Sequence, residues 1–326
     1  MTKRFRPTEH YTPLLLREGP GEGSFAAIDL GSNAIRLLIK DNEGRKLQFV
    51  RIPLRLGIDV FGQGKISKER ESQLIRSIKA FRQLMIIYNV TDYRACATSA
   101  MRDAKNGRKI LHRIAKDLNV DIEIISGQEE ARIICDNHIE QLLQGKASDH
   151  SALQNASSEN LLYMDVGGGS TEISLLVGGQ IQQSVSYDAD TLRMLAGGVS
   201  EDLMQQMRCD LRQMTEGCQG LRIIGSGGNI NKLYRIAPKK QVRKNMLPVT
   251  VLQKLYGQLS SLSVEDRMRE FELRADRADV IVPAAQLFLL VAEAVGATEI
   301  VVPTIGLADG IINELRTKIN NNRLIE

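Results

Sequence analysis

The sequence lacks any long apolar run. No stretch approaches the ~18–20 uninterrupted apolar residues that a membrane-spanning helix needs, although 43% of the 326 residues are apolar. Near the N-terminus the only apolar run is residues 14–16, which is too short for the core of a signal peptide. We therefore expect a flexible leader at 1–22, no contact with a membrane and a cytoplasmic location.

Cysteine and net charge are also sparse. The cysteines, Cys96, Cys135, Cys209 and Cys218, form no CxxC pair and lack the neighbours of a zinc site. We expect reduced thiols. The net charge of +4 is mild and predicts no nucleic-acid partner, although a local basic cluster could still bind a polyanion.

A basic cluster of this kind occupies the stretch RIAPKKQVRK at 235–244. A run of like charges is commonly a solvated loop. The alternative is a track for the distal phosphates of a polyphosphate chain, and its candidate residues are Lys239, Lys240, Arg243 and Lys244.

The P-loop signature is missing, since no GK[ST] follows a glycine-rich turn. The sequence does contain YMDVGGGSTEISLL at 163–176, in which three glycines stand between two apolar strands. Successive N–H groups in such a turn form an anion-binding nest, and Ser170 and Thr171 add hydroxyl donors. Asp165 and Glu172 flank the turn, and a carboxylate pair beside a phosphate suits a bridging divalent cation. The alternative is an ordinary glycine-rich hairpin.

The same design occurs earlier, in AIDLGSNAIRLLI at 27–39. Asp29 matches Asp165, Gly31 matches Gly167, and Ser32 falls close to Ser170. Strands and helices alternate along the rest of the chain, which is typical of α/β layers. We therefore predict a duplicated α/β fold with a cleft between two domains. The predicted boundaries are a leader at 1–22, domain I at 23–133 plus 306–320, and domain II at 134–305.

A third glycine loop, GSGGNINK at 225–232, lies between a predicted strand and a predicted helix. Its match to the dinucleotide pattern G-x-G-x-x-G breaks at Ile230. We interpret Gly225, Gly227 and Gly228 either as a phosphate contact at a helix N-terminus or as a tight turn that serves packing.

Several motifs in order carry a family resemblance. They are DLGSN at 29–33, ATSAMRDA at 97–104, SGQEEAR at 126–132, DVGGGSTE at 165–172 and RADVIVP at 277–283. Over roughly residues 24–318 the chain resembles the exopolyphosphatase/guanosine pentaphosphate phosphohydrolase family. That family belongs to the actin, sugar kinase and Hsp70 ATPase superfamily.

The resemblance implies two actin-like, ribonuclease H-like domains with phosphate bound in the cleft between them. It implies removal of terminal phosphate from polyphosphate, pppGpp or both, with water and Mg²⁺, or Mn²⁺ as an alternative, and a homodimer. By resemblance, Glu130 is the base that activates water, and Asp165 and Glu172 are the acids around the metal. The phosphate-binding positions are Asn33, Arg102, Gly168, Ser170 and Thr171, to which we add Gly227.

The two adjacent glutamates receive different predicted roles. Ser126-x-x-Glu129 fits a capping box, which gives Glu129 a local role at a helix start. Glu130 does not occupy that position, and its alternative to catalysis is a favourable interaction with the helix dipole. Arg102 is either a bidentate phosphate ligand or a surface partner for an acid such as Asp103.

The chain also departs from the family pattern. It ends at Glu326 without the C-terminal helical extension of the long members, so we expect a short form. Ala308 replaces a family arginine, and 186–195 matches a second motif only loosely, with Arg193 as the equivalent arginine. The alternatives to a polyphosphate phosphohydrolase are a pppGpp phosphatase, an ATP-dependent kinase or ATPase of the superfamily, and a non-catalytic sensor of polyphosphate or an alarmone.

Overall fold

The computed structural model describes residues 23–144, 160–178, 180–303 and 306–323. Contacts divide the chain into a first unit, Met1–Ser126 with Leu307–Glu326, and a second unit, Gly127–Gly306. The predicted leader at 1–22 lies outside the described residues. The sequence-based boundary stood at 133/134, whereas here residues 127–133, with both adjacent glutamates, belong to the second unit.

The first unit contains a five-stranded sheet in the order β3-β2-β1-β4-β5. β1 pairs antiparallel with β2 and parallel with β4, and β2 pairs antiparallel with β3. The strands are β1 (Ser24–Leu30), β2 (Ile35–Lys40), β3 (Lys46–Ile52), β4 (Val90–Ala97) and β5 (Glu123–Ile124). This sheet carries the first copy of the repeated hairpin.

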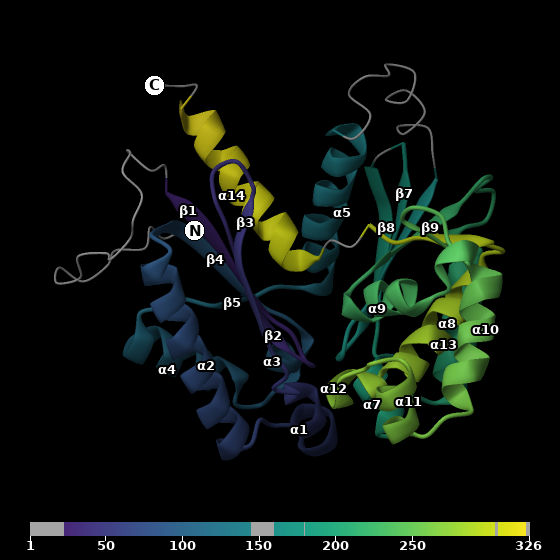
Figure 1. Cartoon of the computed structure of the whole chain (residues 1–326), viewed down its shortest axis with the longest axis horizontal. Helices are drawn as coiled ribbons and strands as arrows, with labels where there is room; N and C mark the ends of the chain where they lie inside the picture. Colours follow the sequence, from purple (N-terminus) through teal and green to yellow (C-terminus); the bar gives the residue numbers. More distant parts are fainter. Residues whose placement is uncertain (1–22, 145–159, 179, 304–305, 324–326) are drawn as a thin grey trace. The chain divides into compact units, whose positions relative to one another are not determined.

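Helices cover both faces of the first sheet (Figure 1). They are α1 (Leu56–Gln63), α2 (Lys68–Ile87), α3 (Ser99–Asp103), α4 (Gly107–Leu118) and α14 (Leu307–Arg323). The core on the α2 side includes Ile28, Leu37 and Phe81, because alternate strand residues point to one face. The other face carries α14, which packs mainly on β1 and β4.

The second unit repeats this plan with a six-stranded sheet in the order β10-β11-β9-β6-β7-β8. Its strands are β6 (Leu161–Val166), β7 (Thr171–Val177), β8 (Gln180–Tyr187), β9 (Arg222–Ser226), β10 (Met246–Pro248) and β11 (Glu299–Val301). β6 pairs antiparallel with β7 and parallel with β9, as β1 does with β2 and β4. The duplicated α/β fold is therefore confirmed.

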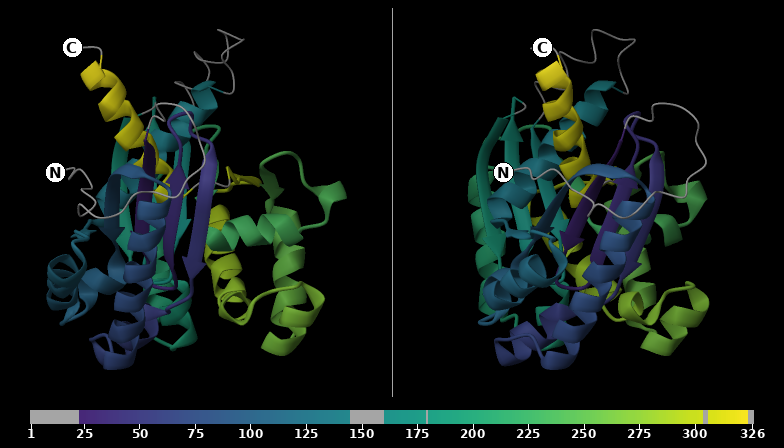
Figure 2. Two further views of the ribbon diagram at one scale, coloured as in Figure 1. Left: turned by 60° about the vertical axis from the view of Figure 1, so that its left-hand side comes forward. Right: turned by 90° about the vertical axis from the view of Figure 1, so that its left-hand side faces the viewer.

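One face of the second sheet carries α5 (Gly127–Gln144), which packs on β6, β7 and β8. The other face carries the apolar helix α13 (Ile281–Ala294) and its neighbours over a core that includes Met164, Ile173 and Phe288. The remaining elements are α7 (Thr191–Leu195), α8 (Glu201–Met214), α9 (Gly228–Ile236), η1 (Lys239–Gln241), α10 (Val249–Ser260), α11 (Val264–Glu270) and α12 (Ala275–Ala278). Figure 2 shows these helices from two further sides.

The helices α5 and α14 each pack on the sheet of the other unit from the strand that precedes them in the chain. α5 directly follows β5 of the first unit, yet it packs on the sheet of the second. α14 follows β11 of the second unit, yet it packs on the sheet of the first. Each sheet is thus covered on one face by the helix that continues from the last parallel strand of the other.

The edge strands β3 and β8 are elements that the sequence analysis did not predict. Both pair with a recognised strand, but most of their residues are exposed or half-buried, and β8 begins QIQQS. Without a buried face at every second position, the alternating apolar signal is weak.

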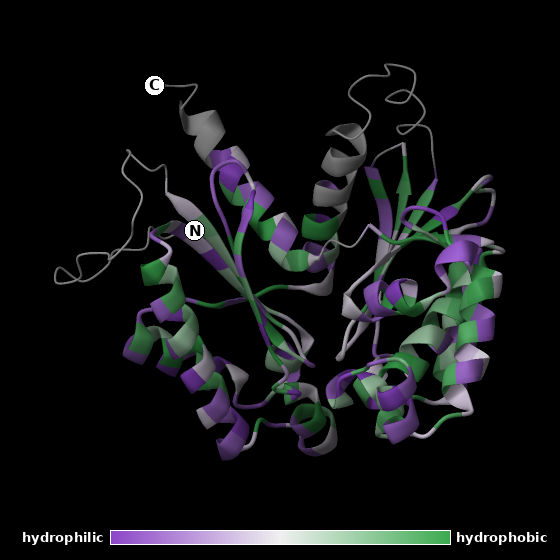
Figure 3. Ribbon diagram, viewed as in Figure 1, coloured by the Kyte–Doolittle hydropathy of each residue, from purple (hydrophilic) through white to green (hydrophobic). Residues whose placement is uncertain are grey.

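Helices such as α2 and α10 show mixed hydrophilic and hydrophobic residues in Figure 3. Among the described residues, no helix has the length and apolar character to cross a bilayer.

Candidate active site

The glycine turn of the second unit presents unpaired backbone donors. Gly167 N–H donates to the Ser170 carbonyl at 3.1 Å and closes the turn. In the part of the chain that the structure describes, the N–H groups of Gly168, Gly169 and Ser170 have no hydrogen-bond partner. A Cβ on Gly167 would lie 3.2 Å from the Ser170 oxygen. A side chain at Gly167 would thus crowd the turn, and the free N–H groups of the turn suit an anion.

A row of polar residues crosses the sheet beside this turn. Asp165 on β6 pairs directly with Glu172 on β7, and Glu172 in turn pairs with Ser186 on β8. On the other side, Asp165 pairs with Ser226 on β9. Because directly paired residues share one face, all four side chains lie on the face that carries α5. The predicted acid pair is therefore brought together.

Glu172 is held tightly in this row. Its side chain is 4% exposed, and Oε1 accepts hydrogen bonds from the Ser170 hydroxyl at 2.8 Å and the Ser186 hydroxyl at 3.0 Å. A Cβ on Gly127, the first residue of α5, would lie only 2.4 Å from Oε2. The N-terminus of α5 thus lies directly against the carboxylate of Glu172, where the helix dipole favours negative charge.

Glu129 and Glu130 both lie in this first turn of α5. Both oxygens of Glu129 accept hydrogen bonds from Arg132, from Nε and from Nη2 at 2.9 Å each. Glu130 lies within one helical turn, about 5 Å along the axis, of the residue that contacts Glu172. The fold therefore brings Glu130 close to the acid pair, and it gives Glu129 a cationic partner. The capping box stays a prediction.

The third glycine loop also reaches the acid pair. Gly227 precedes α9 with φ 97°, and a Cβ there would lie 2.4 Å from Asp165 Oδ1. Asn229 in the first turn of α9 accepts a hydrogen bond from Arg277 Nη1. Sequence reasoning assigned no role to Arg277, although it begins the quoted RADVIVP motif. Its guanidinium lies against Gly228 and places a positive charge at this loop.

The first hairpin has the same turn as the second but differs in the pair of residues beside it. The turn is closed by the equivalent bond, from Gly31 N–H to the Ala34 carbonyl at 3.2 Å. Asp29 pairs with Arg36, and the two form an ion pair, whereas the equivalent pair in the second unit is Asp165 with Glu172. Only the second copy therefore has two acids at the turn. In this register Ala34, not Ser32, matches Ser170.

The predicted phosphate-binding residues Asn33 and Arg102 both lie in the first unit. Asn33 is in the hairpin turn and is 8% exposed. Arg102 lies in α3, and its Nη1 donates to the Ile125 carbonyl at 2.8 Å. A guanidinium has five N–H donors, so this bond leaves others for a further acceptor. Ala308, the departure from the family arginine, is buried in the first turn of α14.

The fold turns the Thr171 side chain away from the acids. Strand residues alternate between faces, so Thr171 and Glu172 point in opposite directions. The Thr171 hydroxyl is fully buried and donates to the Ala189 carbonyl. Its predicted role as a hydroxyl donor to phosphate therefore does not fit this geometry.

The basic segment lies beside β10, at the sheet edge three strands from β6 and so about 14 Å away. Lys239, Lys240 and Lys244 are exposed. Arg243 forms an ion pair with Glu299 and a β-bridge with Met246. The three lysines, and Arg235, which is exposed as well, are thus cations of this segment that are available to a ligand.

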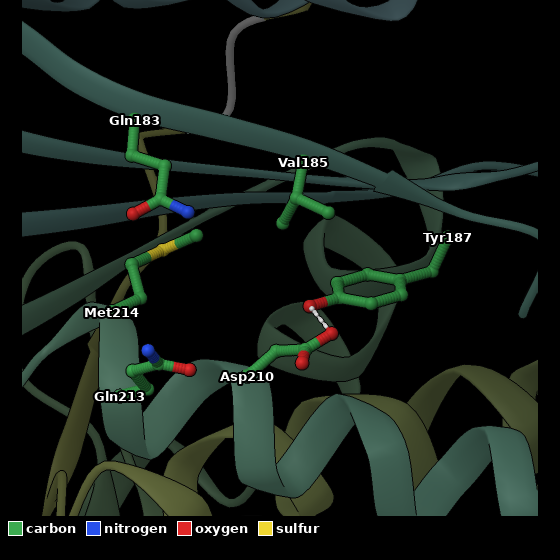
Figure 4. A pocket seen from close by; sticks show the side chains of 6 residues that line it. All are labelled: Gln183, Val185, Tyr187, Asp210, Gln213 and Met214. Carbon is green, nitrogen blue, oxygen red and sulfur yellow. Dashed lines mark hydrogen bonds between the residues drawn. The ribbon is translucent and has the colours of Figure 1, made fainter.

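A separate cavity of about 330 Å³ lies between β8 and α8 (Figure 4). Tyr187 and Asp210 point toward each other across it, and the Tyr187 hydroxyl donates to Asp210 Oδ2 at 3.1 Å. Burial raises the pKa of Tyr187, and the neighbouring Asp210 carboxylate raises it further. The other lining residues are Gln183, Val185, Gln213 and Met214. This cavity lies on the face of the sheet opposite to the acid pair.

The acid pair fits a divalent cation. Like charges directly opposite each other on neighbouring strands are unfavourable, and a bound cation would offset that cost. Among the residues that the structure describes, no group of three or more His, Cys, Asp or Glu side chains gathers. Mg²⁺, however, is commonly bound by one or two carboxylates together with water and substrate phosphates. Asp165 and Glu172 would supply those carboxylates.

The second unit of this duplicated α/β fold thus combines a glycine turn whose N–H groups suit an anion with an adjacent acid pair, which is an arrangement suited to phosphate groups. The chain belongs to the Ppx/GppA phosphatase family, whose model matches residues 48–318. It is therefore a member of a family of phosphatases that act on phosphoanhydride bonds.

Named relatives are similar in sequence to this chain, and solved structures share its fold. Exopolyphosphatase 1 of Mycobacterium tuberculosis is 26% identical over 289 residues, which cover 82% of this chain and 79% of that protein. The guanosine-5'-triphosphate,3'-diphosphate pyrophosphatase of Aeromonas hydrophila is 24% identical, over 88% of this chain and 58% of that protein. The crystal structure of an exopolyphosphatase from Cytophaga hutchinsonii has a TM-score of 0.75 at 23% identity and covers 90% of this chain and 98% of its own. A Ppx/GppA family member from Aquifex aeolicus has a TM-score of 0.71 at 22% identity, with 91% and 98% covered.

Proposed function

We propose that this protein releases terminal phosphate from inorganic polyphosphate by attack of water. The observation that carries the proposal is the acid pair Asp165 and Glu172 at a turn with unpaired N–H donors, with Glu130 in the adjacent first turn of α5. The relative named exopolyphosphatase 1 supports polyphosphate as the substrate, since 79% of its length is covered. A homodimer and a cytoplasmic location remain predictions.

In the proposed reaction, the turn N–H groups bind the oxygens of the terminal phosphoryl group. Glu130 orients a water molecule for in-line attack and accepts its proton. Asn33 and Arg102 are proposed as further phosphate contacts. Mg²⁺ held by Asp165 and Glu172 would neutralise negative charge on the phosphate. Phosphoryl transfer of this kind depends mainly on positioning and charge stabilisation.

A pppGpp 5'-phosphatase is the second candidate, because the Aeromonas hydrophila relative carries a guanosine name. Phosphate release from long polyphosphate, pppGpp and ATP, measured in parallel at equal concentration, separates the candidates. We expect the highest kcat/KM with long polyphosphate. A higher value with pppGpp would favour the second candidate, and release from ATP alone would reject both.

Removal of divalent cations is expected to abolish phosphate release while the circular dichroism spectrum stays unchanged. Added Mg²⁺ should raise the melting temperature, because a ligand at 100 times its Kd stabilises the fold by about 2.7 kcal/mol. Asp165→Asn and Glu172→Gln should each reduce that thermal shift. Turnover that persists in excess EDTA would contradict the proposed metal site.

Replacing Lys239, Lys240 and Lys244 by alanine is expected to raise KM for long polyphosphate more than for tripolyphosphate. The reason is that only a long chain would extend to the β10 edge, and the effect should shrink at high salt because exposed charges are screened. Arg243 is kept in this variant since it pairs with Glu299; a second variant adds Arg243→Ala.

The matched control for this variant removes the same amount of charge from the first unit, through alanine at the exposed Lys68, Lys79 and Lys109. The control should leave the ratio of the two KM values unchanged. If both triple variants change the ratio equally, the track does not exist and the effect comes from net charge alone.

A further inference from the structure

The carbonyl groups of the glycine turn in the second unit are held by two side chains from one short helix. The Gly167 carbonyl accepts a hydrogen bond from the Thr191 hydroxyl at 3.1 Å. The Gly169 carbonyl accepts one from Arg193 Nε at 3.3 Å. Both donors come from α7, which follows the edge strand β8. The turn is thus bound to α7 through its oxygens.

These bonds fix the directions of two N–H groups. In a planar trans peptide, the C=O of one residue and the N–H of the next point in opposite directions. Holding the Gly167 carbonyl therefore aims the N–H of Gly168, and holding the Gly169 carbonyl aims the N–H of Ser170. Both are among the N–H groups that have no partner in the described residues.

A buried carboxylate caps the helix that carries both donors. Asp190 is 0% exposed, and its Oδ1 accepts hydrogen bonds from Leu192 N–H at 2.9 Å and Arg193 N–H at 3.0 Å. Its Oδ2 lies 3.0 Å from Arg193 Nε. Thr191 is also fully buried. Burial raises the pKa of Asp190 to about 6, while its bonds to Arg193 act in the opposite direction.

In the first unit, two carbonyl groups of the equivalent turn also accept hydrogen bonds, but the donors are backbone N–H groups. The Asn33 carbonyl accepts a hydrogen bond from Arg55 N–H at 2.9 Å, and the Ser32 carbonyl accepts one from Gly57 N–H at 2.9 Å. Asn33 occupies the position of Gly169 in the repeat. The donors lie at the start of α1, the helix that follows the edge strand β3. The same carbonyl is thus held in both copies, by backbone in one and by side chains in the other.

We propose that Thr191 and Arg193, held by Asp190, are positioning residues that aim the N–H groups of Gly168 and Ser170 at the reacting phosphate. The proposal rests on the proposed function, in which this turn binds that phosphate. None of the three side chains needs to contact the substrate. Their contribution is to orient peptide groups before the substrate binds.

The test compares Thr191→Val, which keeps the side-chain shape but removes the donor, with Thr191→Ser, which keeps the hydroxyl. The matched control is Thr215→Val in the same unit, because the Thr215 hydroxyl also donates to a backbone carbonyl, that of Leu211 at 2.7 Å. We expect Thr191→Val to lower kcat/KM for polyphosphate about 5- to 10-fold, the scale of one lost hydrogen bond. Thr191→Ser should restore most of this loss, and Thr215→Val should have no effect on kcat/KM. Arg193→Gln should act in the same direction as Thr191→Val.

A second readout does not depend on turnover. Inorganic phosphate added to the ¹⁵N-labelled protein should shift the amide resonances of Gly168 and Ser170, and Thr191→Val should weaken that binding by a similar factor. If the protein releases phosphate but Thr191→Val matches Thr215→Val in kcat, KM and phosphate affinity, the positioning role is wrong while the function stands. If the protein releases no phosphate from any substrate, the proposed function fails. The amide shifts alone then decide: weaker binding in Thr191→Val supports the positioning role, and equal or absent binding overturns it.

Discussion

Glu130→Gln is expected to lower phosphate release by ~10²–10⁴-fold, the usual contribution of a general base, while the melting temperature barely changes. The amide keeps the shape of the side chain but cannot accept the proton of the attacking water. The residue lies in the first turn of α5, whose first residue contacts Glu172, and we propose that it holds the attacking water beside the acid pair. The measurement is kcat on polyphosphate together with thermal unfolding.

The neighbouring Glu129 provides the matched control. Its carboxylate is bound by Arg132 on the same helix, so Glu129→Ala removes a half-exposed ion pair and, if the capping box forms, a cap. The expected cost is on the order of 1 kcal/mol of stability, with most of the activity retained. Near-normal turnover in Glu130→Gln with a large loss in Glu129→Ala would show that Glu129, and not Glu130, is the base.

Gly127→Ala is expected to disrupt the acid pair. A Cβ there would lie 2.4 Å from Oε2 of Glu172 and 2.7 Å from both Oε1 and Cδ. Because Glu172 is buried and held by two serine hydroxyls, it cannot move without breaking those bonds. We expect a loss of about 1–3 kcal/mol of stability from overpacking. Turnover should fall about 10²-fold, since a displacement near 1 Å can cost that much.

Gly257→Ala is the control for this change. Gly257 lies inside α10 on an exposed side, and a Cβ there would meet nothing within 4 Å. Alanine in such a position should stabilise the helix by about 0.5–1 kcal/mol and leave turnover unchanged. If Gly127→Ala also stabilises the protein and keeps full activity, the close contact between α5 and Glu172 is not part of the site.

The sequence was sufficient to predict the duplicated hairpins, because each begins with a buried strand that is an almost continuous apolar run with an acid near its end. It was also sufficient to place Asp165 beside Glu172, since a tight turn sets the pairing of its two strands. It did not show that Thr171 points away. That orientation follows from strand alternation, but it matters only once the face that carries α5 is known.

Other parts of the site depend on contacts between distant segments. Ser186 reaches Glu172 from β8, an edge strand whose exposed glutamines give no strand signal. Arg277 reaches Asn229 from α12, a helix of four residues. No local pattern predicts such contacts, because they depend on which distant segments become neighbours in the fold. One difference was visible in the sequence. An alignment of the two repeats on Asp29 and Asp165 places Arg36 of the first repeat at the position of Glu172 in the second.

The packing of α5 and α14 has a consequence for how the protein is made. Ribosomes produce the chain from the N-terminus, so the sheet of the first unit is complete once residue 124 has emerged. The helix that covers its second face begins at residue 307, so its buried residues Ile311, Ile312 and Leu315 emerge only after the whole second unit has been made. Until then that face of the sheet, which includes Ala27 and Cys96, is exposed to solvent. Transiently exposed apolar surface favours aggregation. A nascent chain cut short before Ile311 would therefore leave this face exposed and would depend on a chaperone more than its small missing length suggests.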